Sequence, residues 1–552
     1  MTSIQFIVVV EGAGMPKQMP GLTAAARAGL VALAFIVAAP ASGAADPKAR
    51  YGDTMVIGIT GDPGTLNGTT SSNFVEKIIA SNVFSMLIRL DRNFKPVPDL
   101  AKSWTISDDG LTYTFKLNEG VKWHDGKPFS SADVKYTIDE VILPLHTRAG
   151  TYKSVIDKVE TPDANTLIIR LKQPFGPLMN ALGYDFLILP KHLYEGTDIK
   201  ANPYNAKPVG TGPFKFAEWK KGSYVILDKN KDYFVKGIPY LDRLVFQEIP
   251  DAAARVLALE SGDIDYLAYQ ALPSSSVPRL KTNAKLVTSL DGFEALASIE
   301  ILAFNFDNPQ LKDVRVRQAI AYAIDKQAIA EKADYGIGKA ATGPISSLTT
   351  WAYEPNVNKY PYNPQRAAKL LDDAGFPVKP DGSRMTLRLI ADGGVELNRK
   401  ACEIVKEQLQ QVGIKVDLQL VERNVMLDRV YVKRDFDMHV HGFSTGADPA
   451  IDVSRLYVST NIRPVSFTNG SGYRNPKVDA LFEQGQKAFK PEDRAKAYRE
   501  VQKILTDEVP AIWLVEYGIV GVWSKKLHGL HDWSAYSYYQ FWDTWSDTGK
   551  MQ

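Results

Sequence analysis

The sequence predicts a mixed α/β protein with more than one domain. Its 552 residues are too many for a single hydrophobic core of ordinary size. Segments with strand and helix periodicity alternate along the chain, without a regular βαβ repeat. The composition, 45% hydrophobic and 23% charged residues, is typical of a globular protein. We find no internal repeats, low-complexity linkers or blocks of like charge, so interleaved lobes are expected rather than domains joined by linkers.

The N-terminal residues 1–44 predict a signal peptide for export. Lys17 and Arg27 precede the apolar run GLVALAFIVAA at 29–39, and small residues follow, with cleavage expected after Ala44. The apolar run is too short to span a bilayer as a stable anchor. We therefore expect a periplasmic protein.

Two further observations refine this expectation. Residues 1–14 fit poorly in front of a signal peptide, which leaves Met15 and Met19 as alternative starts to Met1. The chain has one cysteine, Cys402, which lies far from the cleavage site and within a helical pattern. An intramolecular disulfide is thus impossible, a lipid anchor is not expected, and Cys402 is interpreted as a small buried hydrophobe.

The hydrophobic periods predict the secondary structure in chain order. Strands are expected at 54–60, 167–171, 224–229, 385–390, 414–421 and 437–443. Helices are expected at 74–87, 251–261, 314–332, 363–374, 398–412 and 492–505. Gly262 and Gly375 directly follow two of these helices and are typical C-terminal stops.

The segment 110–140, GLTYTFKLNEGVKWHDGKPFSSADVKYTIDE, is the most distinctive in the chain. It predicts a strand, a charged turn and a capped amphipathic helix. The amino-acid sequences of this segment and of five later segments resemble one family of receptors. The segments also occur in the order expected for that family. These segments are KPVGTGPFKF (207–216), LESGDIDY (259–266), LAFNFDNPQLKDVRVRQAIAYAID (302–325), NPQRAAKLLDDAGF (363–376) and YRNPKVDALF (473–482). The chain is thus similar to the dipeptide, oligopeptide and nickel group of periplasmic solute-binding proteins, family 5.

The resemblance implies a two-lobed periplasmic binding protein fold of type II-like topology, with an extra domain inserted in the first lobe. The expected first lobe comprises 45–92, 211–305 and 526–552. The expected extra domain is 93–210, and the expected second lobe is 306–525.

The resemblance also implies a function in binding and not in catalysis. The protein would be the receptor of an ATP-binding cassette importer that captures a peptide or peptide-like solute and delivers it to a membrane permease with its ATPase. Alternative ligands for the same fold are an oligosaccharide, an opine-type conjugate or a metal chelate. We expect a monomer without a cofactor, and the net charge of +2 gives no reason to expect nucleic acid as a partner.

In the family, the strand within 437–457 (DMHVHGFSTGADPAIDVSRLY) runs into the cleft and pairs with the ligand backbone. Peptide-binding members carry an acid four positions before the Pro of an acidic-Pro pair, where it binds the ligand's α-ammonium. Counting back from Pro449 gives Thr445, whose hydroxyl cannot offset a buried cation. Asp448 is interpreted either as an acid acting from a shifted position or as a turn cap. The expected ligand-binding residues are Asn67, Thr70, Ser71, Trp351, His441, Phe443, Ser444, Thr445 and Asp448.

Two other interpretations of this segment stay open. Residues 442–446, GFSTG, match the G-x-S-x-G pattern of a secreted serine hydrolase that would use Ser444 with His528 or His531. His439 and His441 alternate on a strand, so both rings would face one side and could ligate a metal or metal chelate. We expect neither catalysis nor a resident metal.

Overall fold

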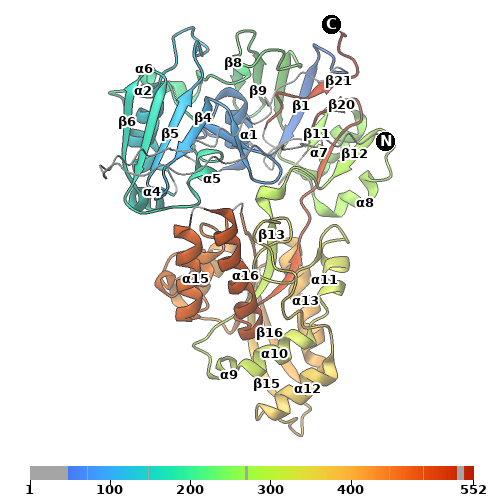
Figure 1. Cartoon of the computed structure of the whole chain (residues 1–552). Helices are drawn as coiled ribbons and strands as arrows, with labels where there is room; N and C mark the ends of the chain where they lie inside the picture. The colour runs from blue at the N-terminus through green and yellow to red at the C-terminus, as the bar shows by residue number, and fades with distance from the viewer. Residues whose placement is uncertain are drawn as a thin grey trace, which may run out of the picture. The chain divides into compact units, whose positions relative to one another are not determined.

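Three β-sheets organise the chain in the computed structural model (Figure 1). The structure describes residues 48–551 except 71–72, 147, 268–270, 447, 489 and 531–539. The predicted signal peptide, Ser71 and His531 therefore lie outside the described residues. No helix among the described residues is long and apolar enough to cross a membrane.

A seven-stranded sheet contains the first described strand. Its strand order is β12 (Leu286–Ser289), β19 (Gly521–Ser524), β11 (Tyr266–Leu267), β1 (Thr54–Ile59), β10 (Arg243–Glu248), β9 (Tyr224–Lys229) and β8 (Phe214–Lys220). The helix α1 (Phe74–Val83) contributes to the core of this sheet. Other helices in this part of the chain are α7 (Ala252–Ser261) and α8 (Val277–Leu280).

A four-stranded antiparallel sheet follows α1 in the chain. Its order is β4 (Ala101–Ile106), β5 (Thr112–Leu117), β7 (Thr166–Leu171) and β6 (Ile156–Asp163). The helices beside it are α2 (Ser131–Tyr136), α3 (Leu143–Leu145), α4 (Ala149–Val155), α5 (Leu178–Leu182) and α6 (Lys191–Tyr194). The predicted strand, turn and capped helix of 110–140 correspond to β5 and α2, where Ser130 and Asp133 form a capping box. Two short pairs, β2 (Ile88–Leu90) with β3 (Pro96–Pro98) and β20 (Leu527–His528) with β21 (Trp545–Ser546), complete the described strands outside the large sheets.

The six-stranded sheet is the part of the fold that builds the site. Its order is β14 (Lys339–Ala340), β18 (Ala511–Glu516), β13 (Ser298–Phe304), β17 (Met438–Ser444), β15 (Met385–Asp392) and β16 (Ile414–Val421). Its helices are α9 (Pro309–Lys312), α10 (Val314–Ala323), α11 (Lys326–Ala333), α12 (Pro364–Asp373), α13 (Glu396–Gln411), α14 (Arg423–Leu427), α15 (Pro476–Lys487) and α16 (Pro491–Glu508).

The two faces of this sheet are covered by different helices. Leu302 of β13 and Val440 of β17 share a core with α10, α11, α12 and α13. Ile301 and Phe443, which point to the opposite face, share a core with α15 and α16. Alternation along a strand separates the two sets, so successive residues of β17 point to opposite faces of the sheet.

Most predicted elements agree with the structure. Strands β9 and β16 have the predicted bounds, and α7 is capped by Asp251 at its start and ends at Gly262, whose φ is 89°. The prediction of one helix over 314–332 is wrong, because the chain leaves the helix at Ile324 (φ −104°, ψ 119°) and Asp325 caps a second helix by accepting from the Ala328 N–H. The predicted helix 74–87 ends earlier, at Val83.

The strand pairing divides the chain differently from two of the predicted boundaries. Strand β13 lies in the range 211–305 expected for the first lobe, but it pairs with β17 and β18 of the six-stranded sheet. Strand β19 lies in the range 306–525 expected for the second lobe, but it pairs with β11 and β12. We therefore propose that the chain passes from the first lobe to the second just before β13 and returns to the first lobe just before β19.

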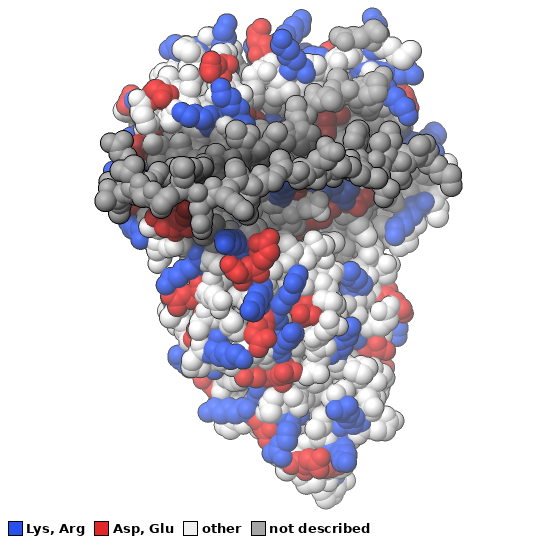
Figure 2. Space-filling model, in the orientation of Figure 1, with Lys and Arg blue, Asp and Glu red and all other residues white. Residues whose placement is uncertain are grey.

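Charge is mixed over the described residues of the face that Figure 2 shows. Where described residues are visible in Figure 2, Lys and Arg side chains alternate with Asp and Glu, and neither sign covers a large region.

Candidate functional site

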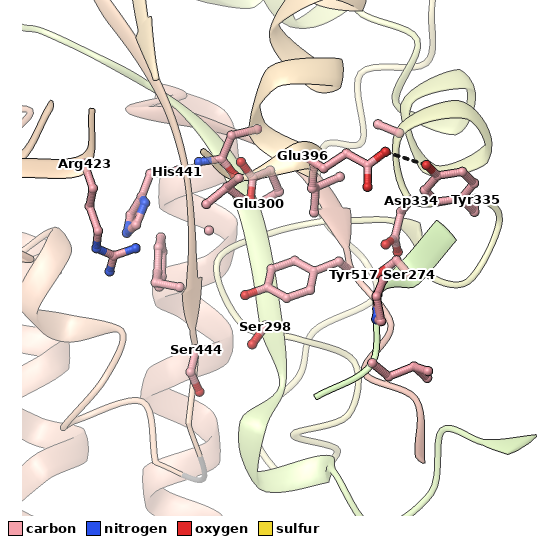
Figure 3. A pocket seen from close by; sticks show the side chains of 18 of the residues that line it. Ser274, Ser298, Glu300, Asp334, Tyr335, Glu396, Arg423, His441, Ser444 and Tyr517 are labelled. Carbon is pink, nitrogen blue, oxygen red and sulfur yellow. Dashed lines mark hydrogen bonds between the residues drawn. The ribbon is translucent and has the colours of Figure 1, made fainter. Parts of the chain in front are cut away.

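A cavity of about 870 Å³ lies where β13 begins and β17 ends (Figure 3). Its walls come from both strands, from the end of α11, from the start of α13 and from residues 272–274 after β11. A volume of this size is typical of a site for a small organic ligand.

The strand β17 presents an open edge to this cavity. On one side it pairs with β13 along its whole length, from Met438 to Ser444. On the other side, β15 pairs only with Met438, His439 and Val440. In the described part of the chain, the segment His441–Ser444 therefore has no neighbouring strand on that side, and all four of its residues line the cavity. An open edge of this kind can pair with an extended peptide through main-chain hydrogen bonds.

Acidic side chains gather on the face of β17 toward α11 and α13. Glu396 accepts a hydrogen bond of 2.5 Å from the Tyr335 hydroxyl and pairs with Lys400 at 3.1 Å. Asp334 accepts from the Gly338 and Gly518 N–H groups. Burial raises the pKa of Asp334 to about 6, against these hydrogen bonds. Both carboxyl groups therefore have partners within the protein.

Glu300 is the third acid on this face. It lies on β13 directly opposite Gly442 and is 1% exposed. Its Oε1 is buried and has no hydrogen-bond partner among the described residues. Burial, together with the charge of Asp334, raises the pKa of Glu300 to about 8.

Two arginines line the cavity beyond the other face of β17. Figure 3 shows Arg423 beside His441, across the strand from Glu300. Arg423 lies 3.8 Å from Asp392, and the Nε of Arg455 donates to the Asp452 carbonyl at 3.0 Å. Burial, followed by repulsion from these two arginines, lowers the pKa of His441 to about 3, so the ring is neutral. In the part of the chain that the structure describes, nothing is hydrogen-bonded to its buried Nε2.

Three of the predicted binding residues line this cavity, namely His441, Phe443 and Ser444. Thr445, the next residue, does not line it. Its N–H and its hydroxyl both donate to the Ala297 carbonyl at 2.7 Å. The hydroxyl thus fastens the end of β17 to the residue preceding β13.

Asp448 has partners within the protein. It is 1% exposed, and its two carboxylate oxygens lie 2.6 and 2.8 Å from Nη2 of Arg494. It also accepts from Asn180 Nδ2 at 3.1 Å and from the Ala450 N–H at 3.0 Å, as a turn cap does. These contacts occupy the Asp448 carboxylate, which the sequence analysis considered as a possible binding group for the α-ammonium of the ligand.

The other predicted residues that the structure describes do not line this cavity. Asn67 is buried, donates to Asn205 and accepts from the Thr69 N–H. Thr70 is half-buried and does not line the cavity. Trp351 packs against the Tyr498 ring, with Arg494 over its face at 5.1 Å.

The geometry at Ser444 differs from that of a hydrolase. The residue lies within β17, and its Oγ accepts from the Gly446 N–H. His528 is paired with Asp547 at 3.0 Å and stacks on Trp545, so it serves a different part of the fold. The sharp strand-to-helix turn that exposes a catalytic serine is not present at Ser444.

His439 and His441 lie on one face of β17, as alternation predicts. His439 packs edge-on against Phe436 and Tyr431, whereas His441 packs against Phe467 at 5.3 Å between centroids. Among the described residues, no group of three or more His, Cys, Asp or Glu side chains is placed to hold a metal ion.

The sequence analysis missed most of the polar lining, namely Ser298, Glu300, Asp334, Tyr335, Glu396, Arg423, Arg455 and Tyr517. One signal was available for Glu300. It is the only charged residue in the otherwise apolar and small segment SIEILAF, all of which is buried. An unexplained charge in a buried strand indicates a functional role.

Comparison with known proteins gives concordant results. The family described as bacterial extracellular solute-binding proteins, family 5 (middle) matches residues 95–463. The oligopeptide-binding protein AppA of Bacillus subtilis is 31% identical over 486 residues, which cover 85% of this chain and 87% of that protein. The glutathione-binding protein GsiB of Escherichia coli K12 is 30% identical over 516 residues, covering 91% of this chain and 96% of the relative.

A solved structure is similar over nearly the whole chain. The ABC transporter substrate-binding protein CtaP of Listeria monocytogenes superposes with a TM-score of 0.79 and 27% identity, covering 90% of this chain and all of that structure. The fold is therefore the expected two-lobed one of periplasmic binding proteins, with mixed α/β content.

Proposed function

Because the chain belongs to the bacterial extracellular solute-binding proteins of family 5, a family of binding proteins rather than enzymes, we propose that it binds a peptide or peptide-like solute in the cavity along β17. The protein would act as a monomer in the periplasm after removal of residues 1–44. It would deliver the solute to the permease and ATPase of an ABC importer. The hydrolase interpretation of Ser444 is set aside.

The open edge of β17 is the observation that carries this proposal. Peptide main chains have the repeating N–H and C=O groups that an unpaired strand edge satisfies. A sugar or a metal chelate has no such repeat, so the edge favours a peptide over these alternatives. The names of two relatives, which bind oligopeptides and glutathione, support the same class.

Native mass spectrometry of the protein purified from a periplasmic extract, without denaturation, tests the class of ligand. A co-purifying mass that fragments as a peptide is the expected result. A sugar-like, opine-like or metal-containing mass would contradict the proposal, and an empty protein would be screened with tripeptides by thermal shift, where a bound ligand raises the unfolding temperature.

A second experiment tests main-chain pairing itself. Trialanine is compared with analogues methylated at each amide nitrogen, which keep the side chains but cannot donate at that position. Pairing with β17 predicts that methylation of at least one amide weakens binding about tenfold, the effect of losing one well-placed hydrogen bond. Equal binding of all analogues would exclude pairing with the strand edge.

A further inference from the structure

Glu300 carries a buried carboxyl oxygen, Oε1, for which the described residues supply no hydrogen-bond donor. Its side chain lines the cavity. The residue opposite on β17 is Gly442, and a Cβ there would lie 2.5 Å from Glu300 Oε2. The absence of a side chain at this position thus leaves the carboxyl group room on the open strand.

The neighbouring acids, unlike Glu300, have partners for their carboxyl groups. Glu396 is held by Tyr335 and Lys400, and Asp334 is held by two backbone N–H groups. Among the described acids that line the cavity, Glu300 is therefore the one with a buried carboxyl oxygen that accepts no hydrogen bond. A buried carboxylate without a partner is strongly unfavourable, whereas a cation in the cavity would compensate it.

Positively charged side chains line the cavity on the other side of β17. Arg423 and Arg455 line the cavity beside His441, which faces away from Glu300 because side chains alternate along β17. In the described part of the chain, Arg455 has no carboxylate partner, and the carboxylate near Arg423 is 3.8 Å away. The guanidinium groups can thus bind an anionic group of a ligand.

We propose that Glu300 binds a cationic group of the solute and that Arg423 and Arg455 bind an anionic group on the other face of β17. The inference rests on the proposed function and narrows its substrate class to zwitterions. An extended ligand that pairs with the edge of β17 directs successive substituents to opposite faces, so one short peptide can reach both charges. The cation is either the α-ammonium or a Lys or Arg side chain.

Ionisation of the carboxyl group agrees with this role. Asp334 at the end of α11 and the Cys402 thiol of α13 interact electrostatically with Glu300, Gly442 of β17 lies opposite it, and Glu396 and Tyr517 line the same cavity. The pKa of Glu300 is raised to about 8 by burial and by Asp334. A bound cation would lower this pKa, so binding at neutral pH would release a proton from Glu300.

The test uses three pools of tripeptides incubated with the full-length mature protein and analysed by native mass spectrometry. One pool has free termini, the second is N-acetylated, and the third is C-amidated. Wild type should retain free peptides at least about 30-fold more strongly than acetylated ones. Glu300→Gln should abolish this preference, and Arg423→Gln combined with Arg455→Gln should abolish the preference over amidated peptides. Glu331→Gln, at an exposed site on α11, is the matched control and should keep both preferences.

The outcomes distinguish failure of the role proposed for Glu300 from failure of the proposed peptide binding. If acetylated peptides are retained only when they contain Lys or Arg, and Glu300→Gln loses them, the cation is a side chain and the proposal stands. Equal retention of free and acetylated peptides regardless of sequence, or an unchanged preference in folded Glu300→Gln, overturns the role of Glu300 alone. Retention of nothing from any pool counts against the peptide-binding function itself. Circular dichroism and thermal unfolding establish that each variant is folded.

Discussion

Arg494 and Asp448 form a buried ion pair in which one guanidinium nitrogen lies 2.6 and 2.8 Å from the two carboxylate oxygens. The side chains are 7% and 2% exposed. Arg494 belongs to α16, and Asp448 follows β17, so the pair joins the helical layer to the loop that leaves the site. This acid therefore supports the fold beside the cavity.

Removal of this carboxylate should destabilise the protein. Asp448→Ala leaves a buried guanidinium unpaired, and breaking such a pair costs about 3–5 kcal/mol. Urea denaturation measures the free energy of unfolding. Glu483→Ala, which breaks the exposed pair with Lys487, is the control and should change it by less than about 0.5 kcal/mol. Equal stabilities of the two variants, or loss of ligand binding by Asp448→Ala without loss of stability, would contradict this assignment.

Glu300 should make stability depend on pH. Its pKa is about 8 in the folded state against an ordinary value of 4.5. Between these values the folded chain holds a proton that the unfolded chain has lost. The free energy of unfolding therefore falls as the pH rises through this window, by on the order of 1 kcal/mol per pH unit.

Glu300→Gln should remove this part of the slope, so the variant becomes more stable relative to wild type as the pH rises. Asp334 contributes a slope of the same sign between 3.8 and about 6, which is why urea denaturation is best compared between pH 6 and 8. Parallel slopes for wild type and variant in that range would show that Glu300 does not titrate there.

A side chain at position 442 should disturb the cavity. In Gly442→Ala the new Cβ would lie 2.5 Å from Glu300 Oε2 and 3.1 Å from Tyr517 Cε1. Overpacking of this kind destabilises the folded protein by about 1–3 kcal/mol. The methyl group also takes room from a ligand beside β17, so tripeptide binding should weaken about tenfold, a loss of about 1.4 kcal/mol of binding free energy. Isothermal titration calorimetry measures the affinity. Gly343→Ala, where the nearest atom to the new Cβ is Thr506 Cγ2 at 3.5 Å, should bind as wild type does. Unchanged affinity in Gly442→Ala would indicate that the ligand does not approach this part of β17.

The single cysteine should be unreactive in the native protein. Cys402 is fully buried within α13, and burial raises the pKa of its thiol well above the ordinary value. The thiolate is the reactive form, so a disulfide reagent such as DTNB should label the folded chain only on unfolding. Labelling that follows the urea unfolding curve is the expected result, whereas fast labelling without urea would show that α13 opens locally.

Local sequence was sufficient for most of the elements. Asp251 and Gly262 delimit α7 by a side-chain cap and a left-handed residue, both of which depend only on neighbouring backbone groups. The break between α10 and α11 was missed because the apolar pattern continues across it. Asp325 had a helix-capping side chain, but periodicity alone did not distinguish a cap from an exposed helical acid.

Local sequence patterns were enough to indicate the family resemblance, the mixed α/β class and a strand that carries His441 and Phe443. Which charged side chains meet beside this strand depends on the tertiary structure. Glu300 and Gly442 become neighbours through the antiparallel pairing of β13 with β17, and the cavity opens because β15 stops pairing at Val440. Arg423 reaches it from a helix that follows β16. The register of strand pairs depends on long-range packing, so residues more than a hundred positions apart in the chain carry no local signal that they share one cavity.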